Sequence, residues 1–183
     1  FLSNRNFDVT NDSVLLVKIP DIIGATDSTL TVTPIVSSLP YGVPPNGRQP
    51  DTSATLATND GRVLGGFIKG SELQFVSTSI NPANGAAAIY LGTISNFNTS
   101  PTLQGRIFSI DTLDLAYPNI SYTGNIGGLN QSIISFNYSG PNTYPGFGAI
   151  LNDGAAFSDM VNIKSGDTSI KLLTGKEQRW GDY

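Results

Sequence analysis

The sequence predicts an all-β fold on three observations. Short apolar runs, alternating or continuous, are separated by Gly, Asn, Asp and Pro along the whole chain, as in consecutive strands. No segment has a sustained helical period of apolar residues. The charged fraction is only 13%, and Ser, Thr, Asn and Gly, which suit strand faces and turns better than helix surfaces, fill the polar positions. At 183 residues the chain is long enough to bury a sizeable core.

Ten runs are expected to form strands. In chain order they are SVLLVKI (13–19), TLTVTPIV (29–36), RVLGGFI (62–68), ELQFVSTSI (72–80), AAAIYLGTI (86–94), RIFSIDTL (106–113), NISYTG (119–124), QSIISFNY (131–138), YPGFGAIL (144–151) and SIKLLTG (169–175). Pro34 favours an edge position for its run, because proline cannot donate to a ladder. NDG (59–61), KGS (69–71) and NGA (84–86) supply residues that accept positive φ in turns. The proline-rich stretch 40–50 is typical of an ordered, extended connector.

The strands group in fours. From Arg62 one set covers 62–68, 72–80, 86–94 and 106–113, and a second covers 119–124, 131–138, 144–151 and roughly 163–174. Three strands at 2–9, 13–19 and 29–36 end an earlier set. The interval between sets, roughly 55–65 residues, suits four-stranded propeller blades with long loops. We therefore predict a β-propeller fragment with a partial blade at 1–38, complete blades at 62–113 and 119–174, and the start of another at 179–183. A jelly-roll or β-sandwich is the alternative.

Two complete and two partial blades do not close a ring, and a propeller depends on closure to protect its strand edges. The remainder of the same polypeptide, or another chain, is therefore expected to complete the propeller. The sequence begins Phe1-Leu2 without methionine, which is typical of a processed or excised chain and agrees with secretion.

The segment RWGDY at 179–183 resembles the RWGDYS element that opens a blade in bacterial BNR/sialidase-like β-propeller proteins. Residues 44–62, 117–146 and the hairpin KGSELQF (69–75) are similar to other segments of that group. The resemblance implies a secreted or cell-surface bacterial protein with a propeller fold. Two departures limit what it implies about activity: the aspartate-box turn is missing, and so is an assembled set of three arginines, a tyrosine–glutamate pair and an acid aspartate.

Composition excludes several kinds of chemistry. Cysteine and histidine are both absent, which rules out thiolate zinc sites, cysteine nucleophiles, histidine bases and Ser-His-Asp triads. The net charge is −4 and the basic residues are scattered singly, which disfavours nucleic acid and anionic membranes as partners. The sequence has no run of about 20 apolar residues, so no membrane span is predicted.

Five residues are the candidate ligand-binding residues: Asp60, Arg62, Tyr117, Arg179 and Asp182. Each is expected at or just before an innermost strand, near the propeller axis, where they would converge on a polar ligand such as a sugar. Structural roles compete with this hypothesis. Asp60 would serve a turn, Asp182 would cap backbone donors, and Arg179 would stack on a ring or pair with a carboxylate.

Neither catalytic nor metal-binding residues are predicted. Glu72, Glu177, Asp111 and Asp114 are in strand or hairpin contexts typical of solvated faces. The turns NDG (59–61) and NDGAAFSD (152–159) carry oxygen ligands that suit Ca²⁺, although turn formation alone also explains them. The aromatic residues of the strands are expected to pack neighbouring blades together; they are Phe67, Phe75, Tyr90, Phe108, Tyr122, Phe136 and Phe147.

The sequence therefore favours a non-catalytic propeller segment of a secreted or cell-surface protein, which would act in recognition or adhesion by binding a glycan or a protein through preorganised loops. Two alternatives remain open. One is a part of a sialidase-like glycoside hydrolase, and the other is a viral coat or filament subunit.

Overall fold

The computed structural model describes residues 1–19, 24, 29–125 and 130–180, and within these ranges the chain forms strands and no helices. None of the described residues therefore belongs to a helix able to cross a membrane. The first eight strands are β1 (Leu2–Asn4), β2 (Asn11–Lys18), β3 (Thr31–Tyr41), β4 (Thr55–Leu56), β5 (Val63–Lys69), β6 (Glu72–Ile80), β7 (Ala87–Ser95) and β8 (Thr102–Phe108). The others are β9 (Asp114–Tyr122), β10 (Ser132–Gly140), β11 (Thr143–Asn152), β12 (Val161–Lys164) and β13 (Glu177–Gln178).

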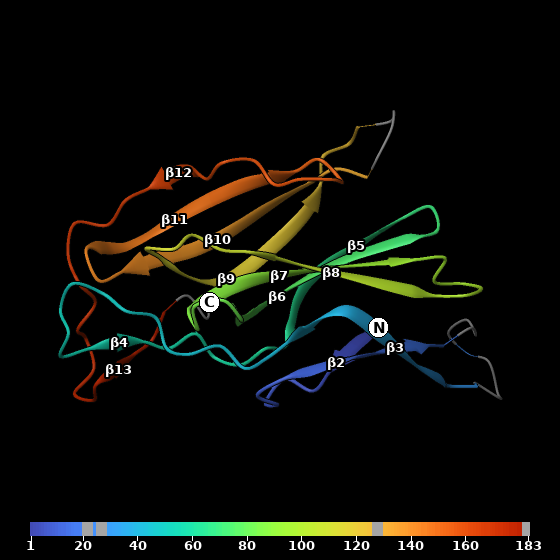
Figure 1. The fold of residues 1–183 in the computed structure, drawn as a ribbon, viewed down its shortest axis with the longest axis horizontal. Coiled ribbons are helices and arrows are strands. Elements are labelled where there is room, and N and C mark those ends of the chain that lie inside the picture. Colours follow the sequence, from blue (N-terminus) through green and yellow to red (C-terminus); the bar gives the residue numbers. More distant parts are fainter. Residues whose placement is uncertain (20–23, 25–28, 126–129, 181–183) are drawn as a thin grey trace.

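The strands form three layers, with β1–β3, β5–β8 and β9–β12 stacked face over face and β4 and β13 at one end (Figure 1). Within each layer, strands that follow one another along the chain pair antiparallel. The expected all-β class is thus confirmed, as is the expected order of neighbours for the first set and for the first three strands of the second set. The predicted turn chemistry is also present, since Asn59, Gly70 and Gly85 have φ of 64°, 61° and 74°.

The first four-stranded set differs from the prediction because it is not a separate sheet. Ser37 of β3 bridges Leu103 of β8 in parallel, which produces one seven-stranded sheet with the order β1-β2-β3-β8-β7-β6-β5. This sheet curls until its two end strands approach each other, and it forms a nearly closed barrel. A buried contact holds the junction, in which the Ser37 and Tyr90 hydroxyls lie 2.5 Å apart and Tyr90 also donates to the Leu39 carbonyl at 3.2 Å.

Two hydrophobic clusters form the core. One fills the barrel between β1–β3 and β5–β8 and contains Val14, Leu16, Ile35, Tyr41, Leu73, Phe75, Tyr90, Ile94 and Leu103. The other lies between β5–β8 and β9–β12 and contains Val76, Ile89, Leu91, Leu113, Leu115, Ile120, Ile134, Phe136, Tyr138 and Ile150. The strands β6 and β7 are therefore buried on both faces, which explains the near-continuous burial of both strands and the mostly apolar sequence of β7.

The aromatic residues pack between layers as predicted, with one exception. Phe75 and Tyr90 lie in the barrel, and Phe67, Phe108 and Phe136 lie in or against the second cluster. Tyr122 contacts Phe67, with ring centroids 5.7 Å apart. Phe147 instead remains 38% exposed.

Pro34 occupies a stretch of β3 that has a neighbour on one side only. It is paired with Leu15 of β2, whereas β8 reaches β3 only at Ser37. The missing N–H therefore costs no ladder bond, as expected for an edge. The face of β3 turned away from the barrel is strongly apolar, and Val32 and Val36 are exposed on it.

Residues 165–180 form a strap that runs back along the molecule to β4. The predicted strand at 169–175 is wrong. Its backbone is hydrogen-bonded to glutamine side chains instead of to a neighbouring strand. Gln49 exchanges two hydrogen bonds with the backbone of Ile170. Gln178 accepts from the backbone N–H groups of Leu172 and Leu173 at 2.7 and 2.8 Å. The fourth strand of the second set is instead β12, which is shorter and earlier.

Candidate ligand-binding site

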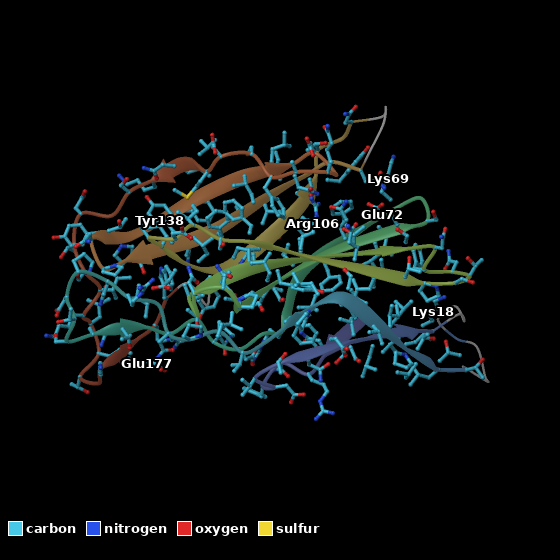
Figure 2. The ribbon with its side chains drawn as sticks, in the orientation of Figure 1. Lys18, Lys69, Glu72, Arg106, Tyr138 and Glu177 are labelled. Carbon is cyan, nitrogen blue, oxygen red and sulfur yellow. The ribbon has the colours of Figure 1, made fainter. Side chains whose placement is uncertain are left out.

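Residues from five parts of the chain line a cavity of about 390 Å³, which we call the Tyr117 pocket. Its lining residues are Phe7, Asn46, Ala57, Asn59, Tyr117, Glu177 and Arg179. The pocket lies beside β4 and β13, and Figure 2 shows Glu177 at this end of the molecule. Two predicted site residues, Tyr117 and Arg179, are thus brought together from positions far apart in the sequence.

A β-bulge places Tyr117. In the β9–β10 ladder Ser135 pairs with Asn119 and Asn137 pairs with Ala116, so that Tyr117 and Pro118 together oppose one residue of β10. A bulge redirects side chains and is a common device beside binding sites. The Tyr117 backbone N–H donates to Thr78 Oγ1 at 3.1 Å, and its hydroxyl donates to the Ala57 carbonyl at 3.0 Å. These contacts hold a tyrosine at φ 52°, where a bulky side chain is strained.

Asn59 is a second left-handed residue in the pocket lining, at φ 64°. Its neighbour Asp60 fixes this turn from beneath. The buried carboxylate of Asp60 accepts from Arg62 Nε at 2.7 Å, from Arg62 Nη2 at 2.6 Å and from Asn6 Nδ2 at 2.8 Å. The hydrogen bonds from Arg62 lower the pKa of Asp60, and those to Asp60 raise the pKa of Arg62. Asp60 and Arg62 therefore support the pocket without lining it.

The strap supplies Glu177 and Arg179. Parallel pairing of β13 with β4 sets Glu177 beside Thr55 and Gln178 beside Leu56. Trp180 then buries its ring, 4% exposed, in a small cluster with Leu56 and Ala116. Arg179 is thus held between two anchored residues. Across the pocket, Asn46 Nδ2 donates to Glu177 Oε2 at 2.6 Å and orients that carboxylate.

Asp182 lies outside the described residues. Sequence reasoning missed Phe7, Asn46 and Asn59 as pocket residues. The signal for Asn59 was its NDG turn, which the sequence analysis interpreted as a turn and as a possible source of Ca²⁺ ligands, and Phe7 showed none. The expectation of a solvated face is wrong for Asp114, which is 1% exposed and accepts from Arg48 Nε at 2.8 Å and Nη2 at 3.1 Å. Its burial follows from β9 starting at this residue and running directly into the core between the layers.

The pocket has the groups of a polar binding site. Among its described lining residues Glu177 is the one carboxylate, whereas glycoside hydrolysis uses a pair about 5–10 Å apart. In the part of the chain that the structure describes, no three acidic side chains gather as a metal site would require. In the turn at 152–159, Asp153 Oδ1 accepts the backbone N–H groups of Ala155 and Ala156. Phenol, amide, carboxylate and guanidinium groups together can bind a hydroxylated ligand and orient it.

Comparison with known proteins adds no relative to this picture: no protein-family model, no curated protein and no solved structure matches the chain.

Proposed function

We propose that this chain is a recognition segment of a secreted or cell-surface β-propeller protein, and that the Tyr117 pocket binds a glycan. The observation that carries the proposal is the convergence of Tyr117, Asn59 and Arg179 on one cavity, with two of the three in the left-handed region. For the bulky Tyr117 such backbone strain costs about 1–3 kcal/mol, and strain of this kind clusters at ligand sites.

The pocket chemistry favours a sugar over an apolar ligand. Phe7 is 74% exposed at the pocket and offers a ring face on which a pyranose can stack. Asn46, Glu177 and Arg179 offer donors and acceptors for hydroxyl groups. The volume of about 390 Å³ is in the lower part of the usual range for small-ligand sites, roughly 300–1,000 Å³. It suits one or two sugar rings.

The layer arrangement supports the propeller part of the proposal. The strands β5–β8 lie between β1–β3 and β9–β12 and are covered on both faces as an interior blade would be, while the bridge from β3 to β8 joins them to β1–β3 in one curled sheet. Both outer layers expose apolar residues, among them Val36 on β3 and Val161 on β12, which are 64% and 63% exposed. A further sheet on each side would bury these residues, as radial repetition does.

Binding of the purified chain to an array of neutral and acidic glycans tests the proposal, with titration calorimetry on any glycan bound. We expect Arg179→Ala to weaken binding at least tenfold. Glu177→Gln keeps an acceptor for Asn46, so its effect isolates the charge. Lys171→Ala is the matched control, since Lys171 is a strap cation that pairs with Asp51 at 3.6 Å outside the pocket. Equal binding by Arg179→Ala and Lys171→Ala would rule out the pocket, and no binding on the array would rule out a glycan.

A further inference from the structure

The barrel has a seam where its two end strands meet without a ladder. Among the described strands, β1 and β5 are the two ends of the seven-stranded sheet. They are tied at one end only, where Asn4 Nδ2 donates to the Gly61 carbonyl at 2.6 Å and Asn6 Nδ2 donates to Asp60. Beyond this tie the backbone edge of β5 has no partner strand within the described residues.

The seam opens into an apolar groove that reaches the barrel core. Two adjoining cavities of about 330 and 390 Å³ follow it and share Phe1, Ile68 and Leu73. Leu73, Phe75 and Leu16 form part of their lining and belong to the barrel cluster. Ile68 is 60% exposed at the edge of the groove. The groove thus runs along an unpaired strand edge, and natural sheets usually cover such edges.

We propose that this groove receives an extended strand of a partner polypeptide that pairs with the free edge of β5. The edge presents backbone donors and acceptors at strand spacing, which an extended peptide matches and a rigid apolar surface does not. A strand added here would extend the sheet beyond β5, whose other edge pairs with β6, and would cover the exposed Ile68.

The lining also defines the chemistry of the partner strand. Among the described residues around both cavities Lys18 has the one charged side chain, and the ammonium group of Phe1, which donates to the Val17 carbonyl at 2.8 Å, adds a second positive charge. Figure 2 shows Lys18 at the opposite end of the long axis from Glu177. The strand that fits has apolar side chains at alternate positions, no basic residue, and one carboxylate placed toward Lys18. The seven residues of β5 span about 23 Å, enough for a segment of similar length.

The test uses a labelled synthetic peptide, Asp-Thr-Val-Thr-Val-Thr-Val, with fluorescence anisotropy for affinity and hydrogen exchange for location. We expect saturable binding and slowed exchange over residues 63–69. Ile68→Lys places a charge in the groove and should weaken binding at least tenfold. Val36→Lys, an equally exposed site on the outer face of β3, is the control and should change the affinity less than twofold.

Charge reversal tests the role of Lys18. Lys18→Glu should weaken binding of the aspartate peptide and strengthen binding of a version with lysine in place of aspartate. A peptide with N-methylated valines should not bind, because it cannot pair with the edge. An equal loss of peptide affinity in Ile68→Lys and Val36→Lys, or no slowing of hydrogen exchange over residues 63–69, would overturn the proposal. So would dimerisation that protects 63–69 without peptide, because a second copy would then fill the groove. The glycan pocket is independent of these outcomes.

Discussion

Replacing Gly92 with alanine should destabilise the barrel strongly, because the ring of Phe75 lies flat over that position. Gly92 pairs with Phe75 on one side and with Gly105 on the other, so ladders fix its backbone in the middle of β7. A Cβ on Gly92 would overlap Cε1 and Cζ of Phe75 and lie 2.9 Å from Cε2. Phe75 is 1% exposed and its ring centroid is 6.1 Å from that of Tyr90, so it cannot simply turn aside.

The structure bounds the size of this effect. If the ring yields slightly, the cost is that of overpacking, about 1–3 kcal/mol. If it leaves the core, the cost approaches that of deleting a buried phenylalanine, about 3–5 kcal/mol. We expect a loss of about 3 kcal/mol in the free energy of unfolding. For a chain of this size that lowers the melting temperature by about 6–12 °C.

A double-mutant cycle in urea isolates the contact. In a Phe75→Leu background the overlapping ring atoms are gone, and Gly92→Ala should then cost less than about 1 kcal/mol, which gives a coupling of about 2 kcal/mol. If Gly92→Ala costs the same with phenylalanine and with leucine at position 75, the ring is not the cause and the reasoning is refuted.

Two further predictions concern Tyr90 and Trp180. Burial raises the pKa of Tyr90 from 10.0 to about 12, so the unfolded chain loses this proton first as pH rises, and stability present below pH 10 falls by about 2 kcal/mol by pH 12. Urea midpoints of Tyr90→Phe should lack this part of the alkaline loss, and parallel pH curves for the two proteins would contradict the assignment. A Cβ on Gly47 would lie 2.7 Å from Cζ3 of Trp180, so Gly47→Ala should displace the ring and shift the fluorescence of the single tryptophan to the red. An unchanged emission spectrum would show that the ring stays in place.

Local signals in the sequence accounted for the strands and the order of neighbours in the first four-stranded set and in the first three strands of the second. Apolar runs and turn residues act over a few positions, and consecutive strands pair through them. The joining of β3 to β8 was not predictable in this way. It depends on Ser37 and Leu103, which are distant in sequence, and on a buried hydroxyl contact that no pattern reveals. The strap was misread as a strand because its apolar residues resemble one, whereas glutamine side chains hold its backbone.

The candidate site was predictable only in part. Tyr117 and Arg179 stand out as an aromatic and a cation beside expected strand starts, and the pocket includes both. Asn46 and Asn59 belong to dipeptides whose ordinary meaning is a turn, and only the folded chain places their side chains opposite the strap. The positive φ of Tyr117 could not be read from its residue type, since it results from a bulge within a long-range ladder.

Because Gln178 holds the strap in place, attachment of the strap and ligand binding in the Tyr117 pocket depend on each other. Two pocket residues, Glu177 and Arg179, flank this glutamine, so detachment of the strap would remove both from the pocket. A ligand that contacts both Tyr117 of β9 and the strap therefore binds only when the strap is attached. By mass action, such a ligand stabilises the attached strap. Hydrogen exchange of the Leu172 and Leu173 amide protons should therefore slow as ligand saturates the pocket, although these amides lie outside the pocket itself.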